Sequence, residues 1–311
     1  MPWRESPAEL ARARAEIPVV FDSPTGRLVG IYTPAAPDAP PAGTCAILLT
    51  RPRSHRNRMW VEGARRLAAQ GFSAFRFDYH GDGDSQGVSG FHNPNQPDRE
   101  DVVSALRFVR ERFGDRRFLT LGMCFDARTA LSVFADEPEA VRGMVFFAAP
   151  LMELDTLVKA HADQKDWKHM LRALTNRENW TSLGDPERWR YMGTVLGRVL
   201  RRGSRANGEA PNDTPLADTF VEHFRALVRS RARALFVYGD TDAEYVSFQV
   251  AQRTVFARLT PEERARFEVE VWPGDVHAFL NVPLQRRALE RALEWFGSFH
   301  PDAKTHEGAK H

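Results

Sequence analysis

The chain has 311 residues, of which 42% are hydrophobic, and it carries a net charge of +2 at pH 7. This length and composition suffice for one large α/β core with a modest insertion. Positive and negative residues are interspersed, so the sequence predicts no nucleic-acid-binding surface. Residues 1–18 lack the apolar core of a signal peptide, and no later stretch approaches the roughly 18 apolar residues of a membrane span. We therefore expect a cytoplasmic protein with no membrane span.

The two cysteines of the chain, Cys45 and Cys124, are too few for a disulfide framework. They also lack the clustered Cys and His spacing of a zinc site. We therefore expect no metal and no cofactor, and a free thiol that can serve chemistry.

The predicted elements begin with an N-terminal helix and an antiparallel hairpin, which turns at residues 23–26. After the hairpin, short apolar strands alternate with helical patterns. The predicted strands begin at Cys45, Ser73, Arg117, Val141, Ala234 and Phe267. Two of the predicted helices follow Asp98, a candidate N-terminal cap, and Pro283. This alternation predicts an α/β fold with a mostly parallel central sheet flanked by helices.

One long stretch, residues 151–233, interrupts the alternation. It contains helical patterns rich in Trp and a polar run of Gly, Pro and Asn residues. We expect a helical lid insertion with a flexible loop near residues 204–214, because that composition buries little apolar surface. The hydrolase-like core would comprise residues 1–150 and 234–300, and residues 301–311 would form a disordered tail.

The strongest chemical signal is the segment around Cys124, where an apolar strand is followed by Gly-Met-Cys-Phe-Asp and then by a helix. This is the strand–turn–helix context of a nucleophile elbow, with cysteine at the nucleophile position. The N-terminus of the following helix offers N–H groups and partial positive charge to a thiolate or an oxyanion. The N–H group of Phe125 is the first expected oxyanion donor.

A histidine and an acid follow in the order that α/β hydrolases use. Asp242 comes after the strand that begins at Ala234, and His277 comes after the last strand. The sequence predicts that His277 is the base and that Asp242 orients it. Asp240 is the competing candidate for the acid.

The second oxyanion donor is expected in the loop after the Cys45 strand. Pro52 has no N–H group, which leaves Arg51 or Arg53 as the donor. Asp126, two residues after Cys124, departs from the Gly or Ala that is usual there. Its carboxylate would oppose thiolate formation unless Arg128 or another cation neutralises it.

Three stretches carry a resemblance to the α/β-hydrolase superfamily over nearly the whole chain. They are Ser54-His55-Arg56, the R-F-D-Y-x-G-x-G-D-S-x-G stretch from Arg76 to Gly87, and the cysteine elbow. Within the superfamily, the chain resembles the exosortase-A-system-associated hydrolases. The resemblance implies a triad of Cys124, Asp242 and His277 that acts on an ester or a thioester.

The first functional hypothesis is therefore a cysteine-dependent hydrolase or acyltransferase. A lyase of the same fold is the first alternative, eliminating a carboxylate such as acetate in tetronate polyketide biosynthesis, with His277 as base. The second is a catalytically decayed binding protein. Arg198, Arg201 and Arg202 lie in the expected lid, where they could attract coenzyme A or an acidic carrier protein that delivers the acyl group.

Overall fold

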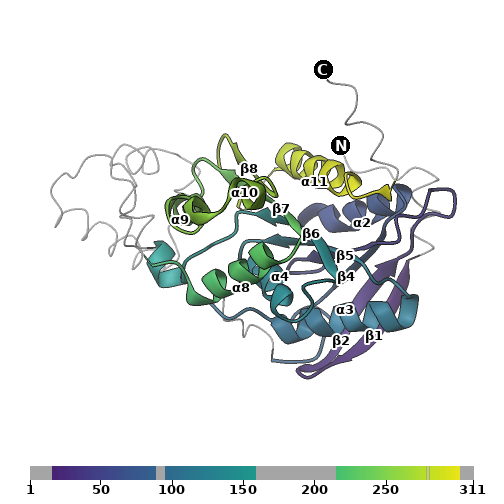
Figure 1. Cartoon of the computed structure of the whole chain (residues 1–311). Helices are drawn as coiled ribbons and strands as arrows, with labels where there is room; N and C mark the ends of the chain where they lie inside the picture. Colours follow the sequence, from purple (N-terminus) through teal and green to yellow (C-terminus); the bar gives the residue numbers. More distant parts are fainter. Residues whose placement is uncertain (1–15, 89–94, 159–214, 278, 280, 302–311) are drawn as a thin grey trace, which may run out of the picture.

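The computed structural model describes residues 16–88, 95–158, 215–277, 279 and 281–301 (Figure 1). Its strands are β1 (Ile17–Ser23), β2 (Gly26–Thr33), β3 (Cys45–Leu49), β4 (Ser73–Phe77), β5 (Phe118–Met123), β6 (Val141–Phe147), β7 (Arg233–Gly239) and β8 (Phe267–Trp272). Its helices are α2 (Met59–Ala69), α3 (Arg99–Phe113), α4 (Phe125–Ser132), α8 (Asp218–Arg229), α9 (Ala243–Arg253), α10 (Pro261–Arg264) and α11 (Val282–Gly297). Short 3₁₀ helices are η1 (Arg56–Arg58), η2 (Val133–Ala135) and η4 (Phe256–Arg258).

The eight strands form one sheet in the order β1-β2-β4-β3-β5-β6-β7-β8. β1 and β2 form the predicted antiparallel hairpin, and β2 also runs antiparallel to β4. All the later pairs are parallel. Every residue of β3, β4 and β5 is buried, as expected for parallel strands that are covered on both faces.

Two helical layers cover the sheet (Figure 1). Alternate residues of β3 divide between them, because successive side chains point to opposite faces. Ile47 and Leu49 join the cluster formed with α3, α4, α8 and α9, whereas Leu48 joins the cluster formed with α2 and α11. This is the α/β-hydrolase fold that the sequence predicts, with a mostly parallel sheet flanked by helices.

The predicted insertion, residues 151–233, is described only at its two ends. At its C-terminal end, α8 packs against α4, and Phe220, Phe224 and Leu227 are buried in the core. Residues 159–214, which include the expected flexible loop, lie outside the described residues, so the lid stays a prediction. The expected N-terminal helix and residues 302–311 lie outside them as well. In the part of the chain that is described, no helix is long and apolar enough to cross a membrane.

The N-terminus of α3 differs from the prediction. Asp98 occupies the N-cap position but makes no capping hydrogen bond with its side chain. Its carboxylate instead forms an ion pair with Arg51. The carboxylate therefore pairs with a full positive charge on a guanidinium instead of with the partial charge of the helix N–H groups.

Candidate active site

The site is built where the parallel strands end, at the carboxyl edge of the sheet. β5 ends at Met123 and α4 begins at Phe125, so Cys124 alone makes the turn. Its φ of 50° and ψ of −129° lie outside the usual regions for a side-chain-bearing residue. A Cβ added to Gly122 would come within 2.5 Å of the Ala127 Cα, so the tight turn requires glycine there. The backbone is that of a nucleophile elbow, and the strain is of the order of 1–3 kcal/mol.

His277 lies in the loop between β8 and α11 and faces the elbow. Its Nε2 lies 3.1 Å from the Sγ of Cys124. The His277 side chain is 43% exposed, so the imidazole contacts the thiol from the solvent side. The two residues that the sequence predicts as nucleophile and base are therefore in direct contact.

The other ring nitrogen of His277 faces Glu244, a residue that the sequence reasoning missed. Its Nδ1 lies 3.6 Å from the Oε1 of Glu244 at the start of α9. The Glu244 side chain is only 5% exposed, and within the described residues its Oε2 has no hydrogen-bond partner. A second carboxylate two residues after Asp242, at the first turn of a helix, was the signal that could have found it.

Asp242 holds the backbone of the histidine loop and does not contact the ring. One of its oxygens accepts hydrogen bonds from the N–H groups of Val276, at 2.8 Å, and His277, at 3.2 Å. The other accepts from Gly239 at 2.6 Å. No ion pair links the Asp242 carboxylate to the imidazole, although the structure describes both residues. The ring contact predicted for Asp242 is thus made by Glu244, and the competing Asp240 only accepts from Gly274, at 2.8 Å.

The surroundings of Cys124 favour the neutral thiol. Burial raises the pKa of Cys124, and the negative charges of Glu244, Asp126 and Asp242 raise it further. A hydrogen bond from the Phe125 N–H lowers this pKa but does not outweigh the other effects. Burial also raises the pKa of Glu244, although His277 opposes that shift. At neutral pH the thiol therefore keeps its proton until a substrate is attacked.

The loop after β3 was predicted to supply the second oxyanion donor from Arg51 or Arg53. In this structure the Arg53 N–H donates to the Asp78 carboxylate at 3.0 Å, so it does not face an oxyanion. Arg51 follows the paired residues Leu49 and Gly122 of β3 and β5 by two positions, as Cys124 does. Its N–H group remains the candidate.

Within the described residues, Arg51 rather than Arg128 forms an ion pair with Asp126. Its Nε lies 3.1 Å from the Asp126 Oδ1. Arg128 instead contacts the Glu153 carboxylate at 3.0 Å and the Thr219 hydroxyl at 2.5 Å. The carboxylate that the sequence places next to the thiol is therefore paired, but with a different arginine.

A buried glutamine connects the two loops that flank the site. Gln285 of α11 donates to the Phe279 carbonyl at 2.8 Å and accepts from the Asn57 side chain at 3.1 Å. His55 packs its ring edge-on to Phe279, with 6.1 Å between the ring centroids. Burial lowers the pKa of His55 to about 4, so this ring is neutral at pH 7. The Ser-His-Arg stretch thus contributes to packing beside the histidine loop.

The donors at the site could also be considered for a metal ion. A sulfur, a carboxylate oxygen and a ring nitrogen from Cys124, Glu244 and His277 lie within 4.8 Å of one another. However, Nε2 faces the thiol and Nδ1 faces the carboxylate. A metal would need one nitrogen directed at the ion that the other two residues share. The arrangement fits a proton relay better than a metal site.

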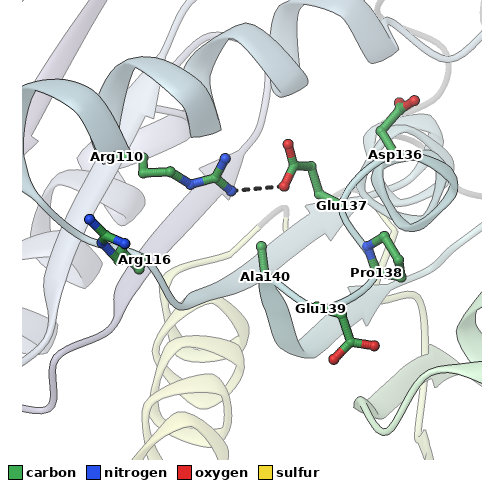
Figure 2. Close-up of a pocket in the computed structure, with 7 residues that line it drawn as sticks. All are labelled: Arg110, Arg116, Asp136, Glu137, Pro138, Glu139 and Ala140. Carbon is green, nitrogen blue, oxygen red and sulfur yellow. Dashed lines mark hydrogen bonds and ion pairs between the residues drawn. The ribbon is translucent and has the colours of Figure 1, made fainter.

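The hollow shown in Figure 2 lies at the opposite, amino edge of the sheet, where β5 and β6 begin. Its lining is mostly charged and consists of Arg110, Arg116, Asp136, Glu137, Pro138, Glu139 and Ala140. Arg110 and Glu137 form an ion pair across it at 2.8 Å. None of the predicted site residues lines this hollow. Arg198, Arg201 and Arg202 lie outside the described residues.

Comparison with known proteins agrees with the fold. A family described as serine aminopeptidase, S33, matches residues 47–187. No curated protein is significantly similar in sequence. An esterase from Pyrococcus furiosus is 13% identical, with a TM-score of 0.57, and the match covers 96% of this chain and 95% of that one.

Two further solved structures show the same likeness. A thermostable carboxyl esterase from Bacillus coagulans is 13% identical, with a TM-score of 0.57, over 92% of this chain and 99% of the other. A proline iminopeptidase from Mycobacterium smegmatis is 14% identical, with a TM-score of 0.54, over 92% and 100%. Such low identities establish the α/β-hydrolase fold alone.

Proposed function

We propose that the protein is a cysteine-dependent acyl-transfer enzyme, a hydrolase or acyltransferase for an ester or thioester. The observation that carries this proposal is the 3.1 Å contact between the His277 Nε2 and the Cys124 Sγ at a nucleophile elbow. The resemblance to exosortase-A-system-associated hydrolases, which have cysteine at the same place, supports it. Glu244 takes the part of the orienting acid.

The reaction begins with a neutral thiol. As the Cys124 Sγ attacks the carbonyl carbon, His277 takes the thiol proton, and the new imidazolium is stabilised by Glu244 behind it. The Phe125 N–H donates to the oxyanion. Collapse of the tetrahedral intermediate breaks the bond to the leaving alcohol or thiol, which receives the proton from His277. Water or an acceptor alcohol then attacks the acyl-enzyme with His277 as base, and the thiol is regenerated.

A buried carboxylate behind the imidazole makes this proton transfer favourable. Its negative charge stabilises the imidazolium that forms, in a surrounding where charge is poorly screened by water. Within the described residues, Oε2 of Glu244 has no hydrogen-bond partner, so this buried carboxylate is stabilised by a cation nearby. Asp242 holds the backbone of the loop that contains His277.

The test is the intact mass of the protein after incubation with an activated acyl ester. We expect one acyl adduct in the wild type and none in Cys124→Ala, while Cys45→Ala keeps the adduct. Turnover that survives Cys124→Ala but is lost in His277→Ala would indicate elimination by a lyase. No adduct and no turnover would indicate a binding protein.

The basic residues of the predicted lid suggest which molecule delivers the acyl group. We propose that the acyl group arrives on coenzyme A or on an acidic carrier protein. Alanine at Arg198, Arg201 and Arg202 should then lower kcat/KM for such a substrate, with a defect that shrinks as salt rises. A small neutral ester should be processed as before. Equal loss on both substrates would contradict the proposal.

A further inference from the structure

Arg51 is surrounded by negative charge directly beside the elbow. Its guanidinium forms ion pairs with three carboxylates, those of Asp82, Asp98 and Asp126. It also stacks on the Tyr79 ring, with its carbon 3.9 Å from the ring centroid. The side chain is only 18% exposed, so its donors face protein groups rather than solvent.

Asp126 is the carboxylate of this group that lies closest to Cys124 in the chain. It is the second residue of α4, and it is 7% exposed. At this position the helix packs tightly against β5, and a Cβ on Gly122 would lie 2.7 Å from the Asp126 carbonyl oxygen. A negative charge two residues from Cys124, in the first turn of the same helix, opposes the formation of a thiolate and raises the pKa of Cys124.

The other charged groups described above at the site are acidic, apart from His277. Glu244 and Asp242 are acidic and lie on the side of α9 and the histidine loop. His277 becomes a cation only by taking the thiol's own proton. Within the described residues, Arg51 holds the Asp126 carboxylate in an ion pair, with its Nε 3.1 Å from Oδ1.

We infer that Arg51 is a positioning residue for the reacting thiol. It holds the Asp126 carboxylate at its Nε and offsets its charge, which lets Cys124 lose its proton during attack. Asp82, Asp98 and Tyr79 fix the guanidinium in that place, so it does not turn toward a substrate anion. This inference rests on the proposed role of Cys124 as the nucleophile.

The experiment is the rate of alkylation of Cys124 by iodoacetamide as a function of pH, read by peptide mass, in four proteins. They are the wild type, Arg51→Met, Asp126→Asn and the double variant. Arg51→Met should raise the midpoint of the pH profile by about one unit, a tenfold slower reaction below the midpoint. Asp126→Asn should lower the midpoint, and the double variant should return it to within about half a unit of the wild type.

Several outcomes would overturn the inference. They are an unchanged midpoint in Arg51→Met, an unchanged or raised midpoint in Asp126→Asn, and a double variant that stays as slow as Arg51→Met. Arg51→Met removes the cation that three carboxylates share and could fail to fold. Asp126→Asn then decides alone, because it keeps Arg51 paired with Asp82 and Asp98.

This measurement is separate from the test of the proposed function. Alkylation needs no turnover, so shifted midpoints without an acyl adduct would indicate that the proposed function fails while the charge relation between Arg51 and Asp126 is as described. Conversely, an acyl adduct that forms normally in every variant would support the nucleophile and contradict the role of Arg51.

Discussion

The two edges of the sheet differ in which residues adopt positive φ. At the amino edge, the turns that lead into β3, β4 and β5 place glycine at positive φ, at Gly43, Gly71 and Gly114. At the carboxyl edge, glycine also occurs at positive φ, at Gly81, Gly83 and Gly274, but residues with side chains occupy this conformation as well, after β3, β5, β6 and β8. In the described part of the chain they are His55, Asn57, Arg58, Cys124, Ala148 and Phe279.

The strained residues with side chains indicate which edge of the sheet carries the reactive site. Glycine adopts positive φ without steric cost, whereas other residues pay about 1 kcal/mol or more for it. The amino edge uses glycine, so its turns carry no such strain. The carboxyl edge keeps side chains at strained positions, and these positions lie in the loops that carry or flank Cys124 and His277. Such strain persists where the surrounding structure over-determines it, which is typical of sites selected for chemistry.

The largest expected difference between the edges concerns the two thiols. Cys45 begins β3 and is fully buried, whereas Cys124 is partly exposed. Alkylation of Cys45 requires opening of a central strand, so it should be at least about 1000-fold slower than that of Cys124. Time-resolved peptide mass after iodoacetamide treatment checks this. Equal labelling of both residues, or faster labelling of Cys45, would contradict the assignment of Cys124 to an open site.

The second largest effect compares two glutamates. Glu244→Gln at the carboxyl edge should lower kcat/KM about 100-fold, because a neutral amide no longer stabilises the imidazolium. Glu137→Gln, at the hollow of the amino edge, is the matched control and should leave kcat/KM unchanged. Steady-state kinetics on an activated ester measure both. If both variants were equally active, Glu244 would not be the orienting acid.

Asp242→Asn separates the two acids at the site. An amide cannot accept the three backbone hydrogen bonds that the carboxylate accepts. We therefore expect this variant to lose thermal stability as well as activity, whereas Glu244→Gln loses activity alone. Thermal unfolding followed by circular dichroism distinguishes them.

A third effect tests the glycine solution of the amino edge. A Cβ at Gly71 would lie 1.9 Å from the Pro40 carbonyl oxygen, at a φ of 85°. Gly71→Ala should therefore lower the free energy of unfolding by about 2 kcal/mol, from the clash and the backbone strain together. Urea denaturation measures the change. A variant as stable as the wild type would show that the turn relaxes freely.

The smallest effect exchanges the two solutions. Ala148→Gly should relieve strain at a φ of 46° and raise the free energy of unfolding by up to about 1 kcal/mol. Gly114→Ala places a Cβ in open space at a φ of 83°, so it should cost about 1 kcal/mol from conformation alone. Urea denaturation again measures both. Changes of the same sign in the two variants would contradict the comparison of the edges.

The sequence predicted the fold because the fold rests on local patterns. Each parallel strand is a short apolar run, and the elbow keeps its Gly, Cys and helix in consecutive residues. The contact between Cys124 and His277 could be predicted from the order of strands, since the parallel strands that precede these two residues end at the same edge of the sheet.

The choice between Asp242 and Glu244 could not be made from the sequence. It depends on the N–H groups of Val276 and His277, which reach Asp242 only after β7 and β8 have paired. The role of Arg51 was missed for a similar reason. Its three carboxylates come from separate loops and helices, so no spacing in the chain indicates that they converge on one guanidinium.

The Asp242 carboxylate also has a consequence for engineering and divergence. Through three hydrogen bonds it fastens the end of β7 to the loop that carries His277. The loops after β7 and β8 therefore form one structural unit, although some thirty residues separate them in the chain. A new loop grafted after β8, or a longer loop after β7, must therefore keep both the Asp242 carboxylate and the N–H groups that it accepts from. Otherwise both must be replaced together.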